Sequence, residues 1–230
     1  MDSILAILKP VLVFAAVLFF IFFLPLYLLA KVTAKRTKEM KGLANKLGAR
    51  FTDKGKGNLL KEFSALSLFK RANPNYSREC NLIQSQDNQG QTSILDLSIR
   101  TSIHDKSANI PTVVCFKSSQ LNFPEFYLKP RQMLDTLSGK LGYRDVKLDK
   151  YPDFFKTYFF HTKDRSAINA LLTKPEVVNF LKKEKNICIE GKGEYLIVYT
   201  RKRGIPYTIA IDKLEDFIKK SQQIFFLFAD

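Results

Sequence analysis

The chain has 230 residues, which is enough for one membrane helix and one domain of ordinary size. Its three cysteines are odd in number and widely spaced, which argues against a disulfide framework and favours a reducing compartment. The net charge is +15, and residues 31–60 hold nine basic against two acidic residues, so a net +7 of that excess lies in one short stretch.

A long uncharged stretch, Val11–Ala30, comes first among the predicted elements. As a helix, its twenty residues rise about 1.5 Å each and span roughly 30 Å, the hydrocarbon thickness of a bilayer. A cleaved signal peptide is the alternative, because Val32–Ala34 resembles a cleavage site. The apolar core is longer than the usual ~7–15 residues, however, and the residues before it are hardly basic. The sequence therefore predicts an uncleaved transmembrane helix.

Basic residues follow the apolar stretch at once and indicate its orientation. Five of them lie within eleven residues after Ala30, namely Lys31, Lys35, Arg36, Lys38 and Lys41. The positive-inside rule then predicts a single-pass protein with residues 31–230 in the cytoplasm and a short amino-terminal tail outside. We expect these five side chains to lie at the membrane surface. There they either set the topology alone or also bind anionic lipid headgroups.

Residues 31–57 are predicted to form a basic juxtamembrane helix and loop. In and just after Ala34–Lys46, apolar residues recur at the spacing of one helical face, at Met40, Leu43, Ala44 and Leu47. Gly48 suits the end of this helix, and Asp53–Gly57 has the composition of a loop. The apolar face predicts a helix that lies on the following domain or on the headgroups.

Residues 58–230 are predicted to form a cytoplasmic α+β domain with a mostly antiparallel sheet and packed helices. Strand-like segments are joined by turn residues suited to hairpins, and helical patterns lie between them. Strands are expected at Asn81–Gln86, Thr92–Thr101, Thr112–Lys117, Phe126–Leu128, Arg144–Leu148, Phe155–Thr162, Ile187–Glu190 and Tyr195–Thr200. Helices are expected at Leu59–Phe69, Met133–Leu141, Asp164–Leu172, Thr173–Lys182 and from Asp212 onward.

The strand Thr92–Thr101 has the clearest alternation of apolar and polar side chains. The apolar set is Leu95, Leu97 and Ile99, and the polar set is Asp96 and Ser98. Because successive side chains of a strand point to opposite faces, the pattern predicts one buried face and one face in water.

The search for catalytic or metal-binding residues is mostly negative. The two histidines, His104 and His161, are far apart, and no paired CxxC, HExxH or phosphate-binding loop motif occurs. We therefore expect no catalytic residue, no metal site and no cofactor. A membrane-tethered enzyme with a dispersed active site is the alternative, and its first candidates are His161, Asp164, Cys80, Cys115 and Cys188.

Nucleic-acid binding is a further alternative, because the chain is basic. Arg201–Arg203 and the cluster in residues 31–56 supply charge, and Tyr158–His161 supplies rings of the kind that stack on bases. The membrane accounts for the main cluster, however, and aromatic runs in strands usually fill a core. We therefore do not expect a nucleic acid among the partners.

Part of the second half resembles a recurring bacterial pattern. The matching segments are Lys147–Phe155, Tyr158–Asp164, Leu171–Glu176 and Gly193–Ile197. The pattern belongs to uncharacterised bacterial single-pass membrane-anchored proteins with a C-terminal domain of unknown function. This chain departs from it at Lys174, which separates Thr173 from Pro175 where the pattern has Thr-Pro directly. The resemblance covers about residues 144–200, and it implies a bacterial inner-membrane setting and no known catalytic residue.

These features divide the chain into three parts: a tail and transmembrane helix (1–30, with the span at 11–30), a basic juxtamembrane helix and loop (31–57), and a cytoplasmic α+β domain (58–230). The function that they favour is a non-catalytic binding or scaffolding module at the inner face of the membrane. Its expected partners are the lipid bilayer, anionic headgroups and a protein whose identity the sequence does not indicate.

Overall fold

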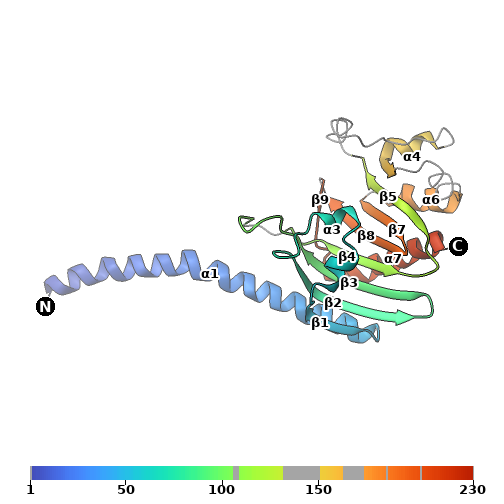
Figure 1. Ribbon diagram of the computed structural model, residues 1–230. Helices are drawn as coiled ribbons and strands as arrows, with labels where there is room; N and C mark the ends of the chain where they lie inside the picture. The colour runs from blue at the N-terminus through green and yellow to red at the C-terminus, as the bar shows by residue number, and fades with distance from the viewer. Residues whose placement is uncertain are drawn as a thin grey trace.

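The computed structural model describes residues 2–105, 109–131, 151–162, 174–184, 186–202 and 204–229, with side chains from residue 19 onward. One long helix leads into an α+β body (Figure 1). The helices are α1 (Asp2–Lys46), α2 (Asn58–Glu62), α3 (Ser67–Lys70), α4 (Pro152–Thr157), α6 (Pro175–Lys183) and α7 (Ile211–Ala229). The strands are β1 (Arg50–Lys54), β2 (Arg78–Asp87), β3 (Gly90–Ser98), β4 (Thr112–Lys117), β5 (Phe123–Pro130), β6 (Tyr158–Thr162), β7 (Ile187–Gly193), β8 (Tyr195–Lys202) and β9 (Ile205–Pro206).

The nine strands form one sheet in the order β1-β2-β3-β4-β8-β7-β5-β6, with β9 attached to β8. Every pairing between these described strands is antiparallel, which confirms the predicted α+β class. The structure differs from the expectation at β1. Arg50 pairs with Gln84 and Lys54 with Cys80, so part of the stretch expected as a loop is the edge strand of the sheet.

Helices cover both faces of the sheet, so its central strands are buried on each side. The end of α1 packs on one face together with α4, α6 and α7, while α2 and α3 cover the other (Figure 1). Each face of the sheet therefore has its own hydrophobic core, and β4 contributes to both. Val114 and Phe116 point into the core under α1, α4, α6 and α7, while Val113 and Cys115 point into the core under α2 and α3. This double coverage explains why β4 is an uninterrupted apolar run in the sequence.

The helix α1 is continuous from the predicted membrane segment into the body. Its final turns bury Met40, Leu43 and Ala44, as the apolar face in Ala34–Lys46 predicts, and Gly48 ends it in the left-handed conformation with φ 62°. Before these turns, the large apolar side chains from Phe19 to Val32 are exposed, and the helix projects from the body (Figure 1). Among the residues whose side chains the structure describes, from residue 19 onward, no helix offers an apolar run of the length that crossing a membrane requires.

The two predicted hairpins are present, β2–β3 around Asp87–Gly90 and β7–β8 around residues 191–193. The expectation that Asp96 and Ser98 face water is wrong, since only 2% and 8% of their surfaces are exposed. The physical reason is that α1 lies over this face of β3 and supplies polar partners for Asp96.

Smaller differences occur in the second half. The segment expected to be extended from Phe155 begins as α4, and only Tyr158–Thr162 is a strand. Helix α6 begins at Pro175, preceded by Lys174 as an N-cap that makes no side-chain hydrogen bond. The helices expected at 133–141 and 164–172, the strand at 144–148 and the cap at Thr173 lie outside the described residues.

Candidate functional site

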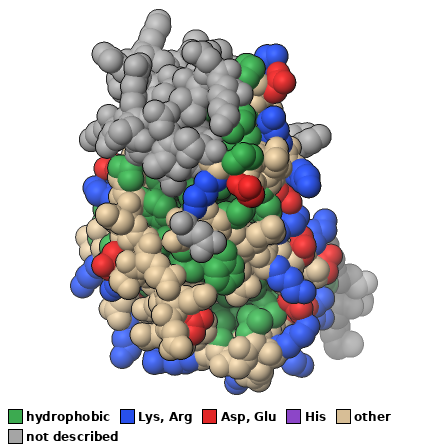
Figure 2. Space-filling model, turned by 90° about the vertical axis from the view of Figure 1, so that its right-hand side faces the viewer, with side chains coloured by type: hydrophobic (Ala, Val, Ile, Leu, Met, Phe, Trp, Pro, Cys, Tyr) green, Lys and Arg blue, Asp and Glu red, His purple; other side chains and the backbone are tan. Residues whose placement is uncertain are grey.

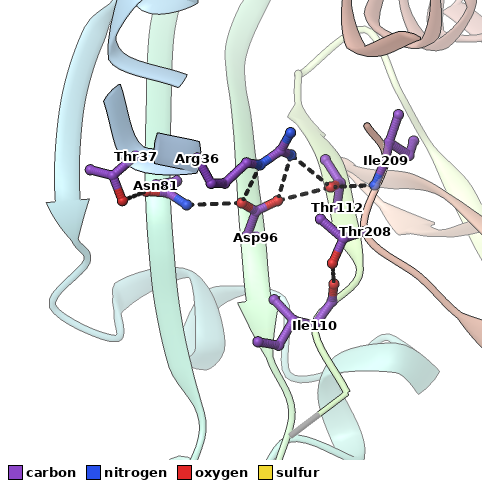
Figure 3. A network of polar contacts seen from close by, with 8 residues as sticks. All are labelled: Arg36, Thr37, Asn81, Asp96, Ile110, Thr112, Thr208 and Ile209. Carbon is purple, nitrogen blue, oxygen red and sulfur yellow. Dashed lines mark hydrogen bonds and ion pairs between the residues drawn. The ribbon is translucent and has the colours of Figure 1, made fainter. Parts of the chain in front are cut away.

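The most elaborate polar arrangement lies where α1 meets the sheet (Figure 3). The guanidinium of Arg36 donates from Nε to Oδ2 of Asp96 at 3.1 Å and from Nη2 to Oδ1 at 3.0 Å. Only 15% of the Arg36 side chain and 3% of the Asp96 side chain are exposed. A bidentate pair of this kind has a fixed geometry and is weakly screened by solvent.

Thr112, at the start of β4, connects the pair to the segment before α7. Its hydroxyl donates to Oδ1 of Asp96 at 2.8 Å, and its oxygen accepts bonds from Nη2 of Arg36 at 3.3 Å and from the backbone N–H of Ile209 at 3.0 Å. A hydroxyl has one hydrogen to donate and two lone pairs, so Thr112 uses its full capacity here.

Asn81 joins the same network through a β-bulge in β2. The pairing of β2 with β3 shifts between Cys80 and Ile83, and Asn81 has a left-handed backbone with φ 51°. Asparagine tolerates this conformation better than most residues. Its Nδ2 donates to Asp96 at 2.9 Å, and its Oδ1 accepts a bond from the hydroxyl of Thr37 at 2.8 Å (Figure 3). The bulge therefore turns the amide of Asn81 toward α1.

The chemical consequence is that Asp96 is saturated. It accepts two bonds from Arg36, one from Thr112 and one from Asn81, which matches the roughly four acceptor positions of a carboxylate. It has no capacity left for a metal, a substrate proton or a ligand. The arrangement, which we name the helix–sheet junction (Arg36, Thr37, Asn81, Asp96 and Thr112), fixes α1 to three strands and to the approach to α7.

The predicted membrane-surface residues separate into two groups. Lys31, Lys35, Lys38 and Lys41 are exposed, as the prediction requires. Arg36 differs, because the structure places its guanidinium against the sheet. The charge count could not distinguish Arg36 from its neighbours, and no sequence pattern marks Asp96, Asn81 or Thr112 as its partners. Contact of Lys31, Lys35, Lys38 and Lys41 with a membrane surface remains a prediction.

A second buried polar cluster lies on the opposite face of the sheet. Glu190 accepts a bond from the hydroxyl of Tyr199 at 2.9 Å and from the backbone N–H of Leu68, at the start of α3, at 3.1 Å. The hydroxyl oxygens of Tyr199 and Tyr127 lie 3.3 Å apart. Burial raises the pKa of the Glu190 carboxyl above its usual value, while these hydrogen bonds oppose the rise. The cluster holds α3 on the sheet.

Glu79 has the same role at α2. Its carboxylate accepts bonds from the backbone N–H of Gly57 at 3.1 Å and of Leu60 at 2.9 Å, in the first turn of that helix. An anionic side chain there satisfies N–H groups that have no partner inside the helix. Both buried glutamates are thus occupied by helix ends.

The described candidates for a dispersed active site come from four strands, with Cys80 on β2, Cys115 on β4, His161 on β6 and Cys188 on β7. Burial raises the pKa of the thiols of Cys80, Cys115 and Cys188, so they are protonated and poorly nucleophilic. His161 lies on β6 opposite Tyr127, and Asp164 is outside the described residues. Within the described ranges, no three metal-ligating side chains form a cluster.

The residues proposed to stack on bases are also placed differently. Tyr158 and Phe160 are 0% and 1% exposed and pack in the core, while Phe159 lies beneath the cations of Lys129 and Arg131. Figure 2 looks onto the side of the body away from the projecting half of α1. On that side the described basic side chains are scattered, with acidic ones among them, and do not form the continuous basic surface that nucleic acid prefers.

Comparison with solved structures finds a similar fold in the mycobacterial trehalose monomycolate transport factor A, TtfA. The TM-score is 0.57 at 12% sequence identity, and the match covers 83% of this chain and 93% of that chain. At this identity the likeness shows the fold alone. No protein-family model and no curated protein matches the sequence.

Proposed function

We propose that this chain is a single-pass membrane protein in which Val11–Ala30 crosses the bilayer and the α+β body is a non-catalytic binding or scaffolding module. The observation that carries the proposal is the continuity of α1. The same helix exposes large apolar side chains from Phe19 to Leu29 and then buries Met40 and Ala44 in the body. A bilayer provides the apolar environment that such a projecting helix lacks in water.

The helix–sheet junction supports a scaffolding role. The carboxylate of Asp96 has no acceptor position left for a substrate, but its hydrogen bonds hold α1 in one orientation relative to the sheet. TtfA, which has a similar fold, is a trehalose monomycolate transport factor, and this supports a non-catalytic accessory role for the present chain.

The proposed location is a bacterial inner membrane, with the body on the cytoplasmic side. The lysines that follow the apolar stretch support this sidedness. Lys31, Lys35, Lys38 and Lys41 are proposed to contact anionic headgroups, each adding on the order of 1 kcal/mol of attraction. The protein partner of the module is defined only by its place, at the inner leaflet or in the cytosol beside it.

The anchor is tested by placing charge in it. Phe19 and Phe23 stack on each other with ring centroids 5.0 Å apart, and both are more than half exposed. Replacing both by Lys adds about 2.5–3.5 kcal/mol of insertion cost per residue near the helix centre. We expect the double variant to be released from carbonate-washed membranes. Phe226→Lys, at an exposed position of α7, is the control and stays bound. Retention of the double variant would contradict the anchor.

Sidedness is tested separately with a tag at the carboxyl end of the full chain. Protease is added to intact spheroplasts and to lysed ones. Protection of the tag until lysis is the expected result. Digestion in intact spheroplasts would place the body outside and would overturn the orientation while leaving the anchor intact.

A further inference from the structure

The register of the sheet defines the end from which α1 leaves the body. Arg36 contacts Asp96 and Thr112, at the end of β3 and the start of β4. The chain that follows α1 enters β1 at Arg50, which pairs with Gln84 near the opposite end of β2. Residues of α1 before Arg36 therefore project past the sheet end that contains Ser98, Thr112 and Lys202. We call this the helix-exit end.

Exposed apolar side chains gather at the helix-exit end. Among the described residues outside α1, the exposed large hydrophobic side chains are Leu47, Ile103, Ile110, Ile205 and Phe226. Ile103 and Ile110 lie in loops and Ile205 in the short strand β9, all at this end, and they are 71%, 40% and 60% exposed. The loops are neighbours, because the hydroxyl of Thr208 donates to the carbonyl of Ile110 (Figure 3).

Basic side chains lie at the same end of the sheet as these isoleucines. The exposed basic residues Lys54, Arg78, Arg100 and Lys202 lie at the same end, and its acidic residues are the exposed Asp53 and the half-buried Asp105. The carboxylate of Asp105 is used within its own loop, where it accepts bonds from the hydroxyl and N–H of Thr101 and from the N–H of Ser102. The net charge that the helix-exit end presents to its surroundings is therefore positive.

The distance along α1 brings this end close to a bilayer. Arg36 lies six positions after Ala30, the last residue of the apolar stretch, which corresponds to about 9 Å of helix. The headgroup layer on each side of a bilayer is roughly 5–8 Å thick. The described part of the loop after β3 projects from the body on the side where α1 leaves (Figure 1), so it extends in the direction of the projecting half of α1.

We propose that the helix-exit end is a second membrane contact, in which Ile103, Ile110 and Ile205 enter the interface of an anionic bilayer while Arg100 and Lys202 bind its headgroups. The inference rests on the proposed anchor, which supplies the nearby bilayer. It adds a surface of the folded body to the membrane-binding residues, and it fixes which end of the sheet faces the lipid. Basic residues around exposed apolar side chains are the combination that binds anionic interfaces.

The chain contains no tryptophan, so a single introduced one reports its own position. Full-length Ile103→Trp is reconstituted into vesicles of phosphatidylcholine and phosphatidylglycerol with brominated acyl chains, which quench indole emission at close range. Asn88→Trp is the matched control, exposed in the β2–β3 turn. It lies at the opposite end of strands that are about 25–30 Å long. Tyr27→Trp reports the anchor itself.

The expected result is a blue shift and loss of most emission for Trp at 103 and at 27, with neither change at 88. Adding Arg100→Glu and Lys202→Glu to the Ile103→Trp chain should restore its emission, because repulsion replaces attraction to the anionic headgroups. Quenching at 27 without quenching at 103 would overturn this inference alone. Absence of quenching at 27 would overturn the anchor instead. Equal quenching at 88 and 103 would show that the body has no preferred end toward the lipid, which also contradicts the inference.

Discussion

The guanidinium of Arg36 and the carboxylate of Asp96 meet side by side, with two N–O distances of 3.0 and 3.1 Å, although 60 positions separate them in the chain. Arg36 lies in a helix that the sequence assigns to the membrane boundary, and Asp96 lies in a strand of the folded body. The pair therefore joins the two parts of the protein whose relationship matters most for the proposed function.

Removing one partner of this pair should be costly. Arg36→Ala leaves Asp96 buried without its counter-ion, and we expect a loss of about 3–5 kcal/mol in the free energy of unfolding. Unfolding of the full chain in detergent is followed by thiol labelling of Cys115 and Cys188, which are buried in the folded state. Lys35→Ala is the control, since Lys35 is 77% exposed and pairs with Glu39 at 3.8 Å. Such an exposed pair contributes under about 1 kcal/mol, and equal costs for the two variants would contradict the buried pair.

Asn81 allows the backbone and side-chain contributions to be separated. Both Asn81→Gly and Asn81→Ala remove the hydrogen bonds to Asp96 and Thr37. Only alanine also strains the left-handed backbone, by roughly 1–2 kcal/mol. In the same thiol-labelling assay we expect wild type to be the most stable, then the glycine variant, then the alanine variant. An alanine variant as stable as the glycine variant would show that Asn81 is not left-handed.

Two glycines should respond to alanine in opposite directions. A Cβ on Gly90, whose φ is 135°, would collide with the carbonyl oxygen of Lys117, so Gly90→Ala should destabilise the β2–β3 hairpin. A Cβ on Gly42, in α1, would have no atom within 4 Å. Gly42→Ala should therefore stabilise the chain by about 0.5–1 kcal/mol through helix propensity. Thermal unfolding gives the melting temperature of each variant. A change of melting temperature with the same sign in both variants would contradict this account.

The buried Glu190 should make stability depend on pH. Burial raises its pKa in the folded protein, so the folded state holds the proton more tightly than the unfolded state. Wild type then loses unfolding free energy as pH rises from about 4.3, the usual value for a glutamate, through the raised pKa. Glu190→Gln has no such titration, so its stability relative to wild type should increase as pH rises above about 4.3.

Asp105 provides a comparison of opposite sign. Hydrogen bonds from the hydroxyl and backbone of Thr101 lower the pKa of its carboxyl. The folded state then favours the ionised form, so Asp105→Asn should lose stability relative to wild type as pH rises through the lowered pKa toward the usual value. The two variants measured over one pH series should give opposite slopes. Parallel slopes would mean that another group dominates the titration.

Much of the fold follows from local sequence signals. The hairpins, the apolar strand β4 and the buried face of α7 all arise from alternation, turn residues or helical spacing within one segment. Leu214, Phe217, Ile218 and Phe225 recur at the spacing of one helical face, and all four are buried in α7. These elements are predictable because the spacing of apolar and turn residues within one segment decides both its secondary structure and which of its side chains are buried.

The helix–sheet junction was not predictable in this way. The alternation in β3 correctly indicates that Asp96 and Leu95 point to opposite faces, but it cannot indicate what covers the polar face. A segment far away in the chain, α1, decides that Asp96 is buried. The edge strand β1 was missed for a related reason, since Arg50–Lys54 has no fully buried side chain and therefore no apolar signal.

Because α1 is continuous, the number of residues between the membrane segment and the body sets the direction in which the body faces around the helix axis. An α-helix turns by about 100° and advances about 1.5 Å per residue. One residue inserted between Lys31 and Arg36 would therefore leave the length of the stalk almost unchanged and yet swing the body through more than a quarter of a circle about the helix axis. Eleven inserted residues make close to three full turns, so the body would face its original direction but lie further from the membrane. The same partner site would then face its original direction, about 16 Å further from the lipid.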